Sequence, residues 1–94
     1  MRISEITESD IAEYLRLDPD TEPDILEHIR KAVVEYIKSY TGMDDAEIDD
    51  HEEFYAAFMV LAQDMYDNRS YVVNNANVNH VVESILGLHR KNLL

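Results

Sequence analysis

The residues that could most readily do chemistry in this chain are carboxylates, which are concentrated in residues 43–53. Seven of these eleven residues are Asp or Glu, and closely spaced carboxylates can bind calcium. The calcium loop of an EF-hand needs oxygen ligands that include its first, third, fifth and twelfth residues, and a glycine at the sixth. A loop that starts at Asp45 has Asp50 at the sixth position and Ala56 at the twelfth, and a loop that starts at Asp18 also fails at both. We therefore interpret the stretch as a solvated acidic turn that leads into a helix.

Histidines and nucleophile motifs suggest no other reactive site. The four histidines, His28, His51, His80 and His89, are scattered, and no two have the spacing of four that a zinc-protease helix requires. The chain has no cysteine, no glycine-rich phosphate loop and no nucleophile motif. Its carboxylates are too numerous to single out one acid–base pair. The sequence therefore predicts no enzyme, no metal site and no cofactor.

A more distinctive polar cluster is formed by Tyr66, Asn68 and Arg69, which end the segment Leu61-Ala-Gln-Asp-Met-Tyr-Asp-Asn-Arg69. At a helix end, an amide and an arginine can bind the last backbone carbonyls. Tyrosine and arginine are also favoured anchors of subunit interfaces. Both interpretations stay open, and Arg90 and Lys91 join the list of candidate interface residues.

The elements that must position these residues are predicted to be helices. The 94 residues fit one domain, 1–94, and the two glycines and two prolines are few enough to favour long helices. Apolar residues at spacings of three and four predict helices over 7–17, 24–40, 50–69 and 78–88. In 70–77, the run Tyr71–Val73 could be extended and Asn74-Asn75 a turn. The sequence thus predicts an all-α fold, a small bundle of about four helices.

Capping residues and apolar stripes complete this prediction. Thr7 is a predicted N-cap, Asp18-Pro19-Asp20 is predicted to stop the first helix, and Thr41-Gly42 predicts a left-handed C-cap on the second. The residues predicted to be buried in one cluster are Ile29, Val33, Ile37, Phe58, Leu61 and Ile85.

Charge limits the partners that the chain can have. Twenty acidic and eight basic residues give a formal net charge of −12, which repels nucleic acid and anionic membranes. The longest apolar runs are far shorter than a bilayer crossing needs, and the N-terminus has no apolar signal region. We expect a soluble, intracellular protein with no membrane partner.

Four pieces of the sequence form a familiar pattern. They are Ile3 before a helix that ends Tyr14-Leu-Arg-Leu-Asp18, an acidic turn before the helix that ends Tyr40-Thr-Gly42, the ending Met65-Tyr-Asp-Asn-Arg69, and Ile85-Leu-Gly-Leu88 followed by basic residues. In this pattern the chain resembles the head–tail connectors of tailed bacteriophages, the small DNA-packaging or head-completion adaptors beneath the portal. The resemblance covers nearly the whole chain, and Tyr-Asp-Asn-Arg is its most specific piece. Family members often have a proline before the final helix, where this chain has Asn77-Val-Asn79.

The resemblance implies a structural role in the virion, at the head–tail junction, for a protein made in the cytoplasm of the bacterial host. It implies a homo-oligomeric ring that docks on the portal protein, extends the DNA channel and offers a platform to the next head-completion or tail component. DNA would pass through without specific binding, and no catalysis is implied.

The distribution of charge suggests how such a ring could be held. Residues 69–94 contain three Arg or Lys and one acid, Glu83, whereas residues 43–53 contain no base. We therefore expect Arg69 or the Arg90-Lys91 tail to meet the acidic surface of a neighbour, with Tyr66 nearby. In the alternative, Arg69 caps its own helix. A second function also stays open, an acidic module that masks a basic protein partner through carboxylates that mimic phosphates.

Overall fold

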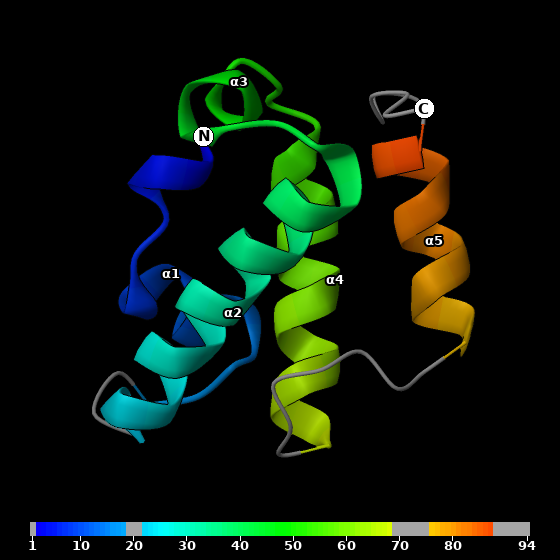
Figure 1. Ribbon diagram of the computed structural model, residues 1–94. Coiled ribbons are helices and arrows are strands. Elements are labelled where there is room, and N and C mark those ends of the chain that lie inside the picture. Colours follow the sequence, from blue (N-terminus) through cyan, green and yellow to red (C-terminus); the bar gives the residue numbers. More distant parts are fainter. Residues whose placement is uncertain (1, 19–21, 69–75, 88–94) are drawn as a thin grey trace.

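The structure of the chain is a computed structural model that describes residues 2–18, 22–68 and 76–87. A 3-10 turn, η1 (Ile3–Glu5), comes first. Five α-helices follow within the described residues, and these residues contain no strand (Figure 1). They are α1 (Glu8–Tyr14), α2 (Pro23–Thr41), α3 (Asp45–Asp49), α4 (Phe54–Asp67) and α5 (Ala76–Leu86). The predicted small all-α bundle is confirmed.

Helix α4 is the centre of the bundle. It stands between α2 and α5, while η1 and α1 lie on the far side from α5 and α3 covers one end (Figure 1). Its sequence is apolar nearly all the way round, which is typical of a helix surrounded by protein. Its side chains that are at most 1% exposed are Phe54, Ala57, Phe58, Met59, Leu61, Ala62 and Met65.

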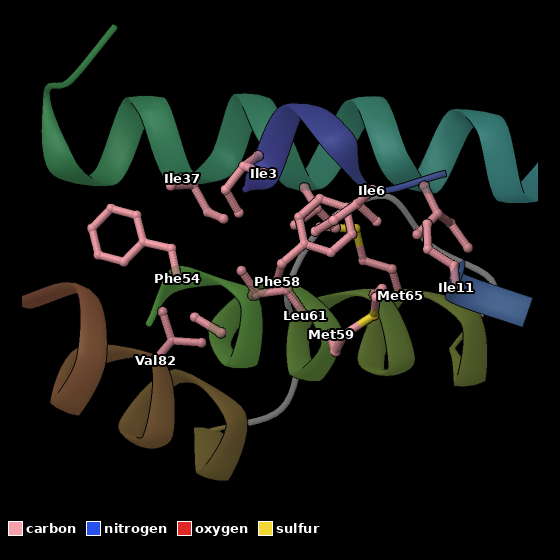
Figure 2. Packing of buried hydrophobic residues seen from close by; sticks show 14 of the residues in the cluster. Ile3, Ile6, Ile11, Ile37, Phe54, Phe58, Met59, Leu61, Met65 and Val82 are labelled. Carbon is pink, nitrogen blue, oxygen red and sulfur yellow. The ribbon is translucent and has the colours of Figure 1, made fainter. Parts of the chain in front are cut away.

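The core is a single cluster to which every described helix contributes (Figure 2). Five of the six residues predicted to form it are fully buried, namely Ile29, Val33, Ile37, Phe58 and Leu61. Ile85 is the exception, because α5 buries Val82 and Leu86 and leaves Ile85 half-buried beside them. Ile85 was predicted to be largely buried with the others, and it is only partly buried, although it packs against the same cluster.

Helix α1 begins where the sequence predicted and ends earlier. The Thr7 hydroxyl accepts from the Asp10 amide at 3.2 Å, and the Asp10 carboxylate accepts from the Thr7 amide at 2.9 Å. At the other end, the Leu17 amide donates to the Ala12 carbonyl at 2.8 Å across Arg16, whose φ is 60°. This is a Schellman closure without glycine. The helix therefore ends at Tyr14 and not at the predicted Leu17, so the turn at Arg16 ends it before Asp18-Pro19-Asp20 is reached.

Helix α2 has the ends that its sequence predicted. Pro23 occupies the first position, where its missing amide hydrogen costs nothing. Gly42 follows the helix with φ of 75°, and its amide donates to the Lys38 carbonyl at 2.8 Å. The left-handed C-cap is confirmed.

The acidic stretch contains a helix that the sequence analysis missed. The Asp44 side chain accepts from the Glu47 amide at 2.9 Å, the Glu47 carboxylate accepts from the Asp44 amide at 3.2 Å, and α3 follows this capping box. Ile48 anchors the helix with 1% of its surface exposed. The predicted helix 50–69 thus begins only at Phe54, and the stretch is a docked helix rather than a solvated turn. Helix α5 begins two residues before its predicted start and ends two before its predicted end.

Candidate functional site

Tyr66, the first predicted interface residue, is half-buried and hydrogen-bonded within its own chain. Its hydroxyl donates to Glu22 Oε2 at 2.9 Å. Glu22 precedes α2 with φ of 47°, a left-handed conformation that costs free energy in a residue other than glycine. The bond therefore ties the end of α4 to the start of α2 across 44 residues of sequence.

Asn68 serves as the cap of α4. Its side-chain Nδ2 donates to the Asp64 carbonyl at 2.8 Å and to Asp64 Oδ1 at 3.1 Å. Asp64 is 5% exposed, so the amide helps to satisfy a buried carboxylate. This is the capping role that the sequence left open for the helix end. Arg69, Arg90 and Lys91 lie outside the described residues, and their interface role stays a prediction.

Removal of the Tyr66 hydroxyl should show how much its hydrogen bond to Glu22 contributes to the free energy of unfolding. We expect Tyr66→Phe to lower the free energy of unfolding by about 1–2 kcal/mol, because the Glu22 carboxylate loses a donor while the ring is kept. Urea denaturation followed by circular dichroism gives the value. Tyr14→Phe, at a tyrosine that is 44% exposed, is the matched control. Equal effects of the two substitutions would contradict the assigned role of the bond.

A second candidate site is a groove of about 230 Å³ where η1, α2 and α3 meet. Its apolar lining residues are Ile3, Val34 and Ile48, and its polar ones are Ser4, Arg30, Asp45 and Asp49. The Ser4 amide donates to Asp49 Oδ1 at 2.9 Å, which fixes η1 against α3. The groove is smaller than the roughly 300–1,000 Å³ of most small-molecule sites, and its mixture of apolar and charged walls suits a peptide segment.

Ion pairs surround this groove. Arg30 Nε lies 2.8 Å from Glu8 Oε1, and Lys38 Nζ lies 3.3 Å from Asp45 Oδ1 and 3.7 Å from a Glu35 oxygen. The hydrogen bond from Arg30 holds the pKa of Glu8 below its ordinary value. The hydrogen bond to Asp45, aided by the charges of Asp45 and Glu35, raises the pKa of Lys38.

The pKa of Glu8 predicts a pH dependence of stability. Glu8→Gln should lower the free energy of unfolding at pH 7 by at most about 1 kcal/mol, because both side chains of the pair are about one-third exposed and water screens them. A lowered folded pKa means that the contribution is complete above the ordinary value of 4.5 and disappears as pH falls through the folded value. Denaturation at several pH values should show the two proteins converging in acid. A constant difference down to the lowest pH would contradict the assignment.

The described residues contain no group of three or more His, Asp or Glu side chains arranged to hold a metal ion. In the same part of the chain, no helix is both long enough and apolar enough to cross a bilayer.

Sequence reasoning named the groove's acids only as part of a charged stretch and did not find the groove. Ile3 and Ile48 are far apart in the sequence, and only folding brings them together. The one local signal was Asp44 followed three residues later by Glu47, a capping pair just before an apolar residue.

No protein-family model, curated protein or solved structure matches this chain.

Proposed function

We propose that this chain is the subunit of a homo-oligomeric ring at the head–tail junction of a tailed bacteriophage. In this role it docks on the portal protein, lengthens the DNA channel and presents a surface to the next head-completion or tail component. The protein is structural, and it carries out no catalysis.

The observation that carries the proposal is where the connector-like pieces of sequence fall. Tyr14-Leu-Arg-Leu-Asp18 forms the end of α1 and its Schellman closure, Tyr40-Thr-Gly42 ends α2, and the described part of Met65-Tyr-Asp-Asn-Arg69 ends α4. These motifs therefore fix where helices stop, which is why such a pattern can specify a fold. The motifs that resemble those of the connector family thus have a structural role in this chain. From this we propose that the chain shares the function of the family as well.

The small size of the subunit also favours assembly. A domain of 94 residues buries only about 60–65% of the surface of its unfolded chain, and association is one way to bury more.

The direct test uses the portal protein that the proposal requires in the same genome. We expect the purified chain to co-sediment with the portal and to add a ring on the portal axis in electron micrographs. Co-sedimentation of a Glu13→Lys/Asp18→Lys variant, altered at two exposed acids, controls for non-specific charge attraction. A chain that neither binds the portal nor adds density to it would contradict the proposal.

A protein that lines or flanks a DNA channel should let DNA slide. We expect no binding of duplex DNA tighter than about 1 µM at about 0.15 M salt, because a net charge of −12 makes the phosphate interaction repulsive. Fluorescence anisotropy with a labelled duplex measures this. Tighter binding that weakens as salt rises would show a basic contact surface. It would contradict the expectation that DNA passes through the channel without being bound.

The second function, an acidic module that masks a basic protein, draws its support from the surface around α3. Asp44, Asp45, Asp50, Glu52 and Glu53 are all exposed there. The portal experiment separates the two functions, because a masking module would bind basic proteins without forming a ring on the portal.

A further inference from the structure

We propose that the groove between η1, α2 and α3 receives residues 88–94 of a neighbouring copy of this chain. The inference rests on the proposed ring and names the contact that joins its subunits. Residues 88–94 lie outside the described part of the chain, and the argument uses their sequence alone.

The chemistry of the segment matches that of the groove. The segment reads Leu-His-Arg-Lys-Asn-Leu-Leu, with three leucines, two adjacent cations and no acid. The groove offers apolar contacts from Ile3, Val34 and Ile48. Asp45 and Asp49 are four residues apart on α3, so their side chains lie on one side of that helix, and both line the groove.

The charges around the groove leave a negative surplus. Two cations are present, Arg30 and Lys38, and four carboxylates accompany them, those of Glu8, Glu35, Asp45 and Asp49. Glu8 engages Arg30, while Lys38 is shared between Glu35 and Asp45. Of these six residues only Arg30, Asp45 and Asp49 line the groove, so its lining has one net negative charge, opposite in sign to the charges of Arg90 and Lys91. Complementary charge of this kind sets the register of an interface and suppresses wrong pairings.

The positions of the two surfaces suit a ring. Figure 1 shows α5 finishing at the same end of the bundle as α3 but on the opposite side of α2 and α4 from η1. Subunits of a ring are related by rotation about one axis, so each must present two different surfaces to its two neighbours. Two surfaces at the same end and on opposite sides of the subunit meet this requirement.

The chain's own tail is the competing occupant of the groove. Seven residues reach at most about 25 Å when fully extended, whereas the subunit measures 43 by 27 by 17 Å. The end of α5 nevertheless lies near α2, since Gly87 is next to the Tyr40 hydroxyl, so the test below must distinguish a link within one copy from a link between copies.

The test exploits a chain without cysteine. Ser4 lines the groove and is exposed, so Ser4→Cys combined with Asn92→Cys should form disulfides between copies under mild oxidation. Non-reducing electrophoresis should then show a ladder of multimers, in the free protein or in the complex with portal. Ser9→Cys/Asn92→Cys, with the first cysteine at another exposed serine, is the matched control and should form far fewer links. A link within one copy, or no excess over the control, overturns the inference.

Charge reversal provides an independent measurement. Asp45→Lys/Asp49→Lys should weaken self-association about tenfold or more by analytical ultracentrifugation, because two attractive pairs become repulsive. Glu13→Lys/Asp18→Lys makes the same change in net charge away from the groove and should have a smaller effect. Arg90→Asp/Lys91→Asp, added to the groove variant, should restore association. Equal weakening by both charge-reversed pairs, or no rescue, overturns the inference.

The groove contact and the proposed ring can fail independently of each other. If the parent forms a ring on the portal but the Ser4–Asn92 link never joins two copies, the groove contact is wrong and the proposed function stands. If the parent shows neither a ring nor portal binding, the proposed function fails as well.

Discussion

Phe58→Ala should remove about 3–5 kcal/mol from the free energy of unfolding. Phe58 is fully buried in the middle of α4, where Figure 2 shows its ring within the cluster of core side chains. Its truncation loses the transfer free energy of the ring and leaves a cavity that the surrounding helices can close only in part. Since the stability of a whole domain is only about 5–15 kcal/mol, the variant should unfold at a clearly lower temperature and a lower urea concentration than the parent.

Thermal and urea denaturation followed by far-UV circular dichroism measure the effect. Tyr14→Ala is the matched control, because its aromatic ring is 44% exposed and its loss should change the unfolding free energy by only about 0.5 kcal/mol. Phe58→Leu should lower the free energy of unfolding by less than Phe58→Ala and by more than Tyr14→Ala. A Phe58→Ala melt that coincides with that of the parent would refute the assignment of this face of α4 to the core.

Ile48→Ala should cost about 2–4 kcal/mol and should release α3 from the bundle. A helix of five residues cannot hold itself together, because helix nucleation is unfavourable in isolation. Ile48 is the buried side chain of α3, and its polar attachments include the Asp49 bond to Ser4 and the ion pair of Asp45 with Lys38. The loss of apolar burial should therefore expose the backbone amides of α3.

Amide hydrogen exchange separates this local release from global unfolding. The α3 amides should exchange much faster in Ile48→Ala, beyond what the drop in global stability explains. Ala46→Ser changes an exposed residue of the same helix and should leave exchange nearly as it is in the parent. Unchanged protection of α3 in Ile48→Ala would show that the capping box alone maintains the helix.

The long helices could be predicted because their apolar stripes and caps are local. The stripe of α2 and its Gly42 cap can be read directly from spacing and residue type, and so can Thr7 at the start of α1. The end of α1 could not, because a left-handed Arg16 has no signature in residue type. It depends on Leu17 packing against the core after the turn. In α3, a single apolar residue among carboxylates gives no periodicity, and only its docking partner makes the helix stable.

The candidate site was less predictable than the fold. Tyr66 and Asn68 were predicted to be important, but the partner of Asn68 is close in the sequence and the partner of Tyr66 is distant. Asp64 is four residues from Asn68, so a cap could be proposed from sequence, whereas Glu22 is 44 residues from Tyr66 and meets it only through the packing of α2 on α4. The groove likewise needs three separate elements and has no local signal beyond a capping pair.

Because α4 is apolar nearly all the way round, the order in which its partner helices are synthesised matters. When the ribosome has completed α4, the partners of that helix in η1, α1, α2 and α3 have already been made, but α5 has not. The side of α4 that α5 will cover is then apolar surface exposed to water on a nascent chain. Until α5 is added, exposed apolar surface of this kind makes an incomplete chain prone to aggregation. The addition of α5 thus completes the cover of α4 and removes this apolar surface from water.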